Sequence, residues 1–334
     1  MKRCYRVLTL MLLFCLLFSS CKKPGPEGGM TLTDQTGREV ILHGEAKRVV
    51  SCYYVTTYAM LSLGLGDRLV GIENKAGTRP IYQMAMPSLL SLPAVGSLKG
   101  IDAERIASLS PDLVLLPEKL TDAIPSLEAL GIPVLAVDPE NEEDLRSMLR
   151  LIGKACGASE KAEKLIDFTD EKTAGFHHEG EAPSVLLTGN SSYLTAAPSG
   201  MYQSGMISLA GGRNAFGGTA GNYWTAVSYE IFFALDPDII VIPSGASYTA
   251  ADLLSDPALA SLRAVKEGRV LAMPGIFEEW DSPIPSGVLG VLWLRAALYP
   301  GTYSPDSFRK DTVDFYETFY GFTPDENDLA ALFP

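Results

Sequence analysis

Short apolar runs alternate with helical stretches along the first half of the chain. At its start, residues 30–42 hold two alternating polar and apolar segments around a turn at 34–37, which predicts a β-hairpin. The next strands are predicted at 48–51, 69–72, 112–116 and 134–137, with helices at 58–65 and 104–109. Short buried strands that alternate with helices are typical of a mainly parallel sheet covered on both faces.

The middle of the chain is predicted to be helical from residue 142 to about residue 176, with a break near Gly157 and Ala158. Ala162, Leu165 and Ile166 recur there at helical spacing between charged residues, so we interpret the region as a stiff connection between two lobes. Beyond it, strands are predicted at 185–188, 239–242 and 270–273, and helices at 206–210, 229–235, 288–298 and 306–322. The expected organisation is an N-terminal lobe at 31–141, a connecting helical region at 142–178 and a C-terminal lobe at 179–334.

An internal repeat supports two similar lobes. Residues 104–117, ERIASLSPDLVLLP, align without gaps on residues 230–243, EIFFALDPDIIVIP, at an offset of 126 residues. Glu, Leu, Pro, Asp and Pro coincide, and the apolar positions of the strand fall in register. Each copy predicts a helix, a Pro-Asp turn and a buried strand, on either side of the helical connection.

The N-terminus has the pattern of an export signal. Lys2, Arg3 and Arg6 precede a run at 7–18 that is apolar except for one threonine, and small residues and Cys21 follow. Twelve helical residues reach only ~18 Å, against the ~30 Å of hydrocarbon that a membrane-spanning helix must cross. Residues 1–20 therefore target the chain and do not span the membrane.

The cysteine at the predicted cut site makes this signal similar to a bacterial lipoprotein signal, although Phe18 stands where Leu is usual. The resemblance implies lipid on Cys21 and a Pro/Gly-rich tether at 21–30. The alternative is a plain secretory signal in which Cys21 is incidental. In the lipidated form the protein would be exported and held on the outer face of the cytoplasmic membrane.

Charge and cysteine content narrow the class of protein further. The chain carries 27 Lys and Arg against 40 Asp and Glu, a net charge of −13, and loss of the three cations in residues 1–20 makes it −16. This charge argues against binding of nucleic acid and against a basic membrane-binding face. The mature chain holds only Cys21, Cys52 and Cys156, so its fold depends on an apolar core and not on a disulfide framework.

Several blocks, in order, resemble the ATP-binding-cassette (ABC) substrate-binding proteins of the siderophore, haem and cobalamin type, the class III periplasmic binding proteins. The blocks are TDQTGREV, SLGLGDRLVGI, GSLKGIDAERIASLSPDLVLL, SLAGGRNAF, SYEIFFALDPDIIVI and LRAVKEGRVLAMP. The resemblance implies two Rossmann-like α/β lobes joined by one long rigid helix, with the ligand in the cleft between them and only small closure. It also implies that Glu104 and Glu230, one on each lobe, dock onto arginine pockets of a permease dimer that works with an ATPase.

Candidate ligand-binding residues lie in loops that follow predicted strands, where parallel sheets usually bind ligands. They are Tyr53, Tyr54, Asn74, Lys75 and Arg79 in the first lobe, and Asn190, Tyr193, Tyr223, Trp224, Glu278, Glu279, Trp280 and Asp281 in the second. Aromatic and acidic side chains together suit a bulky, partly apolar ligand that is cationic or bears a metal. Each residue also has an ordinary explanation: packing for the tyrosines, exposed loop charge for the polar residues, and a sheet cap with buried Trp280 for the acidic loop.

The expected ligand is a ferric siderophore, haem or corrinoid, bound by a monomer without a resident cofactor, so that iron or cobalt would come with the ligand. A bare metal ion is disfavoured because His43, His177 and His178 are the only histidines. A molybdate- or tungstate-type oxyanion is an alternative that backbone amides and Arg79 could bind, although the acidic loop at 278–281 argues against it. Two further classes are a surface-anchored hydrolase that uses the acids of this loop and a structural or sensor lipoprotein.

Overall fold

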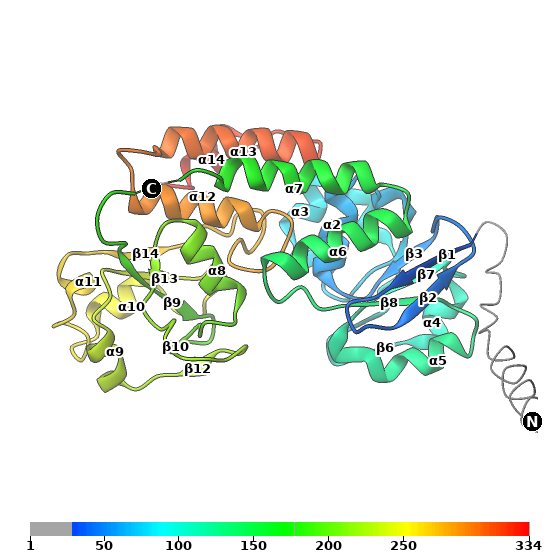
Figure 1. The fold of residues 1–334 in the computed structure, drawn as a ribbon, viewed down its shortest axis with the longest axis horizontal. Helices are drawn as coiled ribbons and strands as arrows, with labels where there is room; N and C mark the ends of the chain where they lie inside the picture. Colours follow the sequence, from blue (N-terminus) through cyan, green and yellow to red (C-terminus); the bar gives the residue numbers. More distant parts are fainter. Residues whose placement is uncertain (1–28, 177, 334) are drawn as a thin grey trace, which may run out of the picture.

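The computed structural model describes residues 29–176 and 178–333, and it shows two α/β lobes side by side (Figure 1). The first lobe begins with a hairpin of β1 (Met30–Thr33) and β2 (Glu39–Leu42), as the sequence predicts. Its central sheet is entirely parallel, in the order β4-β3-β7-β8. The strands are β3 (Val49–Ser51), β4 (Leu69–Gly71), β7 (Leu113–Pro117) and β8 (Val134–Val137), with a small hairpin of β5 (Gly96–Ser97) and β6 (Gly100–Ile101).

Side chains alternate between the two faces of this sheet, which explains why it is covered on both. Val49, Leu113 and Leu115 pack on the side of α2 and α6, whereas Val50 and Val114 pack on the side of α4 and α5. The helices of this lobe are α2 (Tyr54–Ser62), α3 (Pro80–Ala85), α4 (Ala103–Ser108), α5 (Ile124–Glu128) and α6 (Glu142–Ala155). Helix α2 starts four residues before the predicted position.

The early start of α2 depends on hydroxyl groups that the hydrophobic pattern does not reveal. Thr56 and Thr57 are buried, and the hydroxyl of Thr56 donates a hydrogen bond to the carbonyl of Tyr53 at 2.7 Å. The Ser51 hydroxyl bonds both threonine hydroxyls at 2.7 Å. These bonds satisfy polar groups that would otherwise be costly to bury, so a polar segment forms the first turn of a buried helix.

The second lobe has a mixed sheet in the order β12-β10-β9-β13-β14, with β11 also paired to β9. Strands β9, β11, β13 and β14 are parallel, and β10 and β12 are antiparallel additions at one edge, with partly exposed residues. Edge strands lack a continuous apolar run, which explains why the sequence analysis did not predict them. The strands are β9 (Ser184–Gly189), β10 (Ser192–Ala196), β11 (Arg213–Asn214), β12 (Thr225–Ala226), β13 (Ile239–Ile242) and β14 (Val270–Ala272).

The helices of the second lobe again cover both faces of the sheet. Helices α8 (Tyr202–Leu209) and α12 (Gly287–Leu298) share one apolar cluster with Val185 and Val241, and α9 (Tyr229–Leu235) and α10 (Ala250–Ser255) share another with Leu186 and Ile240. The remaining helices are α11 (Arg263–Lys266) and the C-terminal α13 (Pro305–Phe319) and α14 (Glu326–Ala330). Among the described residues, no helix is both long and apolar enough to cross a membrane.

The internal repeat is preserved in detail in the structure. Helices α4 and α9 are capped by Asp102 and Ser228, which are 126 residues apart, and each cap accepts a hydrogen bond from a backbone amide of the first turn. Each helix is followed by a left-handed residue, Ser110 with φ 48° and Asp236 with φ 34°, again 126 residues apart.

The aspartate of each Pro-Asp turn has the same task in both lobes. Asp112 accepts hydrogen bonds from the amides of Lys47 and Arg48, just before β3. Asp238 accepts hydrogen bonds from the amide and hydroxyl of Ser184, at the start of β9. Each aspartate therefore fixes the start of the neighbouring strand, which gives a physical reason for the Pro-Asp identity in the repeat.

One long helix connects the lobes, as the resemblance implies, and a second helix packs alongside it. The predicted break occurs at Gly157, where φ is +65°, and it separates α6 from the connecting helix α7 (Ser159–Thr173). The C-terminal helix α13 returns alongside α7 (Figure 1), and the ring of Phe168 lies 5.6 Å from that of Phe315 and 5.5 Å from that of Phe319. The expected closing helix thus reinforces the connection.

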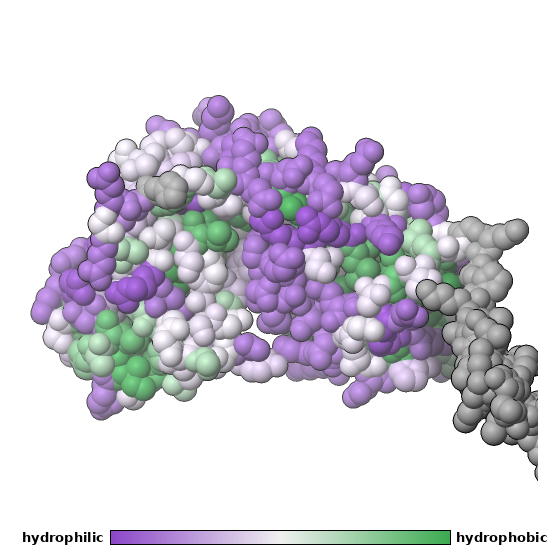
Figure 2. Space-filling model, viewed as in Figure 1, coloured by the Kyte–Doolittle hydropathy of each residue, from purple (hydrophilic) through white to green (hydrophobic). Residues whose placement is uncertain are grey.

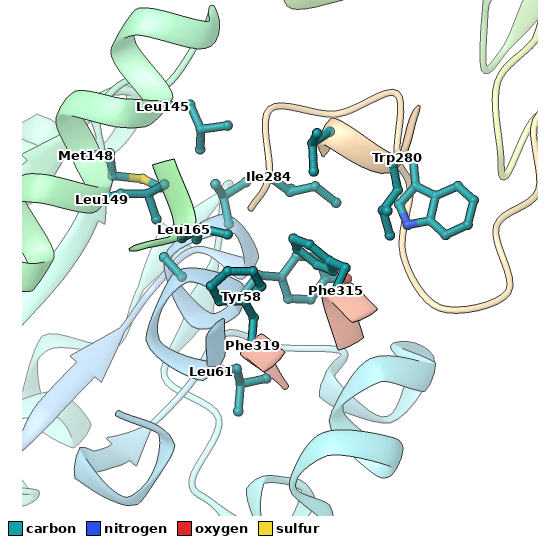
Figure 3. Packing of buried hydrophobic residues seen from close by; sticks show 14 of the residues in the cluster. Tyr58, Leu61, Leu145, Met148, Leu149, Leu165, Trp280, Ile284, Phe315 and Phe319 are labelled. Carbon is teal, nitrogen blue, oxygen red and sulfur yellow. The ribbon is translucent and has the colours of Figure 1, made fainter. Parts of the chain in front are cut away.

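One apolar cluster runs through both lobes and through the helices α7 and α13. In Figure 3, Tyr58 and Leu61 of α2 lie beside Phe315 and Phe319 of α13, and Ile284 of the second lobe points toward the same cluster. Leu145, Met148, Leu149 and Leu165 close the cluster from α6 and α7. The lobes therefore meet through buried apolar contacts.

The loop at 278–281 turns into this core, which corrects the prediction that it presents Trp280 and Asp281 to a ligand. Trp280 is fully buried, and its indole N–H donates a hydrogen bond to the Tyr316 hydroxyl at 3.0 Å. The hydroxyls of Tyr316 and Tyr320 donate hydrogen bonds to the buried Glu278 carboxyl at 3.1 and 2.9 Å. Desolvation raises the pKa of Glu278 to about 7.

Asp281 is buried in the same way. The Ser244 hydroxyl donates a hydrogen bond to its carboxyl at 3.1 Å, and desolvation raises the pKa of Asp281 to about 6. The side-chain amide of Gln203 also fixes the backbone carbonyl of Asp281, at 2.8 Å. Of the three acids in this loop, only Glu279 reaches the surface between the lobes.

The continuous core predicts that both lobes unfold together. Replacing the buried Phe315 with Ala should lower the free energy of unfolding by roughly 3–5 kcal/mol, because it opens a cavity where α7 and α13 meet. Unfolding in urea can be followed by tryptophan fluorescence, which reports the second lobe, and by far-ultraviolet circular dichroism, which reports both lobes. The two signals should give the same midpoint. The control Ile41→Ala, at an exposed position, should change stability by less than about 0.5 kcal/mol. Separate midpoints would contradict the continuous core.

The buried Glu278 predicts a loss of stability as pH rises. The folded protein holds the Glu278 proton up to about pH 7, whereas the unfolded chain releases it near the ordinary glutamate pKa. The free energy of unfolding is therefore highest below the ordinary glutamate pKa and decreases as the pH rises from there to about 7. Between pH 5 and pH 8 the wild type should lose on the order of 3 kcal/mol more than Glu278→Gln, as measured by urea unfolding. Equal pH slopes for the two proteins would show that Glu278 is not held neutral.

Candidate ligand-binding cleft

A cavity of about 420 Å³ opens on the first lobe where it faces the second. It lies at the carboxyl ends of β3 and β4 and is closed on one side by the β5–β6 hairpin. Its lining residues are Cys52, Tyr53, Tyr54, Glu73, Asn74, Lys75, Arg79, Ser97, Leu98 and Lys99. Figure 2 shows a notch between the lobes, with hydrophilic side chains gathered along its first-lobe side. The predicted residues Tyr53, Tyr54, Asn74, Lys75 and Arg79 therefore share one cavity.

Arg79 is the most buried cation among the lining residues of this cavity. Its guanidinium carbon lies 4.0 Å from the ring centre of Tyr54 and 5.6 Å from that of Tyr58, and its Nη1 donates a hydrogen bond to the Tyr58 hydroxyl at 3.1 Å. Its Nε lies 3.4 Å from Glu73 Oε1 but has no hydrogen-bond partner in the described part of the chain. The side chain is only 17% exposed, so its position is fixed before a ligand arrives.

A ladder of tyrosine rings supports Arg79. Tyr53, Tyr54, Tyr58 and Tyr82 follow one another edge to face, with ring centres 5.0, 5.5 and 5.7 Å apart. Burial raises the pKa of each of these phenols, so all four stay protonated at neutral pH. Tyr53 and Tyr54 line the cavity and offer it their rings, whereas Tyr58 and Tyr82 are buried behind them.

The one acid in the cavity wall is already engaged. Glu73 is buried and accepts hydrogen bonds from the hydroxyls of Tyr82 at 2.6 Å and Thr57 at 2.7 Å. Lys75 and Lys99 are exposed at the rim. Because Glu73 is committed to its hydroxyl partners and to Arg79, the exposed charges among the lining residues are the ammonium groups of Lys75 and Lys99.

Two contacts join the lobes across the cleft. Glu279 of the second lobe lies 3.7 Å from Arg79 Nη1 and accepts a hydrogen bond from the Tyr58 hydroxyl at 3.5 Å. The Lys119 ammonium lies 5.9 Å from the ring centre of Tyr223, a second-lobe side chain that is 72% exposed. Glu279 and Tyr223, both predicted ligand residues, therefore face the first lobe.

The other predicted second-lobe residues lie around the end of β9. Asn190 is exposed just beyond the strand, and Trp224 packs so closely over Gly189 that a β-carbon there would come within 3.2 Å of the indole. Tyr193 is engaged elsewhere, because its hydroxyl donates a hydrogen bond to Asp256 at 2.9 Å. Asn190 and Trp224 flank the cleft side of the sheet, while Tyr193 supports the β10 edge.

Five further residues at the cleft were not predicted from the sequence: Tyr58, Glu73, Leu98, Lys99 and Lys119. One signal was available in the sequence, the glycine that opens the stretch GSLKG. This residue, Gly96, has φ +141°, and a β-carbon there would lie 2.5 Å from the backbone carbonyl oxygen of Gly100. Glycines that permit such a tight hairpin would have indicated that Leu98 and Lys99 project from a turn. Nothing comparable in the sequence distinguished Tyr58, Glu73 or Lys119.

The described residues contain no group of three or more His, Cys, Asp or Glu side chains arranged to hold a metal ion. Cys52 lines the cavity, but burial raises the pKa of its thiol to about 12. His43 is exposed, His178 packs on Tyr299 with ring centres 4.4 Å apart, and His177 lies outside the described residues. The acids at 278–281 do not share one open site, because two of them are buried in the core.

Comparisons with known proteins agree with this arrangement. The chain is 25% identical to an uncharacterized ABC transporter substrate-binding lipoprotein, YvrC of Bacillus subtilis, over 91% of this chain and 99% of the relative. It is 24% identical to the molybdate-binding protein MolA of Haemophilus influenzae, over 88% of this chain and 92% of the relative. The crystal structure of a periplasmic solute binding protein from Veillonella parvula superposes with a TM-score of 0.76 at 27% identity, covering 91% of this chain and 97% of the other.

The sequence profile of the periplasmic binding protein family matches residues 49–276, which include both central sheets and the connecting helix. This match, the two lobes and the cleft between them lead to one conclusion. The chain belongs to the periplasmic binding protein family and is an ABC-transporter substrate-binding protein.

Proposed function

We propose that the protein captures an iron or cobalt chelate, a ferric siderophore, haem or corrinoid, in the interlobe cleft and delivers it to an ABC permease. The observation that carries this proposal is the cavity of about 420 Å³ between tyrosine faces and three cations, Lys75, Arg79 and Lys99. Small-molecule sites commonly measure ~300–1,000 Å³ and combine apolar walls with a few polar groups. The cations favour the anionic members of this group, ferric siderophores and haem, over a corrinoid.

An oxyanion is the second candidate. Arg79 has a buried Nε without a hydrogen-bond partner among the described residues, and one relative is named for binding molybdate. The acids of the loop at 278–281 were a reason against an anionic ligand. In the structure Glu278 and Asp281 are buried in the core, and Glu279 faces Arg79. The size of the cavity favours a larger ligand, because a single tetrahedral oxyanion would leave most of it unfilled.

We further propose that lipid on Cys21 anchors the protein to the outer face of the cytoplasmic membrane. Cys21 lies outside the described residues, so this proposal rests on the signal sequence and on the lipoprotein named among the relatives. The mature chain is acidic, and its surface offers no general attraction to anionic lipid. A covalent anchor would therefore supply the membrane attachment that the folded domain lacks.

Docking to the permease is proposed through Glu104 and Glu230. Both are exposed and occupy the second position of their helices, α4 and α9, where the helix dipole favours a negative charge. The Ser228 hydroxyl lowers the pKa of Glu230 and so keeps its carboxylate ionised. In Figure 1, α4 and α9 lie on the same side of the molecule, one on each lobe, opposite α7 and α13. This placement would direct the cleft toward the permease.

Replacing Arg79 with Gln should weaken ligand binding about tenfold or more, because a charge-assisted hydrogen bond contributes ~1.5–3 kcal/mol. Isothermal titration calorimetry with ferric siderophores, haem, cobalamin and molybdate would identify the ligand and measure the change. Arg213→Gln is the matched control, since Arg213 is exposed beside the first residue of β9, at the end of the strand away from the cleft. Binding of molybdate alone would select the oxyanion, and binding of none of the panel would reject the chelate proposal.

Glu104→Arg and Glu230→Arg should each reduce stimulation of the ATPase by the loaded protein, and the double variant should abolish it, because each cation would repel an arginine pocket. Ligand affinity should stay at the wild-type value. Glu160→Arg is the matched control, since Glu160 holds the same position in α7 on the other side of the molecule. Wild-type stimulation by the double variant would rule out docking through these two residues.

A further inference from the structure

An apolar patch lies beside Glu230 on the second lobe. Ile231 and Phe233 of α9 are 42% and 39% exposed, and Leu254 of α10 is 44% exposed. Figure 2 shows a hydrophobic area at the lower left, where Figure 1 places α9. We call Ile231 and Phe233 the α9 apolar face. Exposed apolar side chains are common singly, but a cluster of them usually marks a contact with another molecule.

The internal repeat shows that folding does not require this face. Ile231 and Phe233 correspond to Arg105 and Ala107 in the other copy, at the same offset of 126 residues. In both helices the residue that packs into the sheet is the one between them, Ile106 or Phe232, and both are fully buried. The first lobe thus builds the same helix without exposed large apolar residues. The apolar side chains of α9 are therefore available for another purpose.

The position of the face indicates which contact it makes. Glu230 and Phe233 are three residues apart on one helix, so they are neighbours on its surface. A partner that receives the Glu230 carboxylate would also cover Phe233. The helix equivalent to α9 in the first lobe, α4, lies on the same side of the molecule (Figure 1) and presents Arg105 beside Glu104.

We propose that the α9 apolar face binds an apolar surface of the permease next to the arginine pocket that receives Glu230. This inference rests on the docking proposed above and adds that the two lobes dock by different chemistry. The second lobe would combine one charge with buried apolar area, and the first lobe would depend on charge alone. Salt screens exposed charges but leaves apolar contacts intact, so the two lobes would differ in their salt dependence.

The test uses the full lipidated protein and its cognate permease with ATPase in lipid nanodiscs. The double variant Ile231→Ser with Phe233→Ser should bind the transporter about tenfold more weakly than the wild type, as expected when a central apolar contact is lost. In 0.5 M NaCl the wild type should retain binding that the double variant loses. Ligand affinity and thermal midpoint should match the wild type, because both positions are exposed and lie outside the cleft. Ile41→Ser, at a position 52% exposed on the first-lobe hairpin, is the matched control.

The outcomes separate this inference from the docking proposal. Normal transporter binding by the double variant, together with lost binding by Glu230→Arg, would overturn the inference and leave docking intact. Normal binding by both variants would overturn docking itself. Binding to empty nanodiscs that is weaker in the double variant than in the wild type would overturn the inference by assigning the face to the bilayer. Concentration-dependent dimerisation that the double variant abolishes in sedimentation velocity would overturn it by assigning the face to a second copy.

Discussion

The structure depends on one buried junction, where aromatic side chains of α13 pack against α2, α7 and the loop at 278–284. Phe315 and Phe319 contact the connecting helix through Phe168, and Trp280 is fixed by the Tyr316 hydroxyl. Opening the lobes widely would expose these rings to water, and burying a large aromatic side chain is worth ~1.5–3 kcal/mol. The junction therefore restricts the relative movement of the lobes.

That restriction determines the form of the cleft. Glu279 follows Glu278, whose carboxyl is held in the core by two tyrosine hydroxyls, so its backbone is anchored beside Arg79 of the other lobe. Arg79 is itself held between Tyr54, Tyr58 and Glu73. A ligand thus meets a guanidinium that is already positioned between tyrosine rings and carboxylates, and its binding energy is not spent on ordering these side chains. Tyr223, which is largely exposed, has room to move over an incoming ligand.

The two lobes share one local design and differ in what they attach to it. Each uses a capped helix, a left-handed residue and an aspartate that fixes the neighbouring strand. The first lobe adds the cavity and its cations, and the second adds an antiparallel sheet edge and apolar residues on α9. Similar lobes that carry different surfaces suit a protein that holds a ligand on one side and a transporter across both.

The sequence by itself determined the parallel strands, the hairpin, the break at Gly157 and the repeat. These features follow from local periodicity, turn chemistry and capping, which act within a few residues. It also indicated Tyr53, Tyr54, Asn74 and Arg79 as loop residues that follow strands, and these residues line one cavity because loops after adjacent parallel strands meet at one sheet edge. Only the tertiary structure decided that Trp280 and two acids beside it are buried, because their partners Tyr316, Tyr320 and Ser244 lie 36 to 42 residues away in the chain. Hydrogen bonds between residues so far apart in the chain produce no periodic pattern in the sequence. The sequence alone therefore predicts an open acidic site at this loop, and the tertiary structure is needed to show that its side chains are buried.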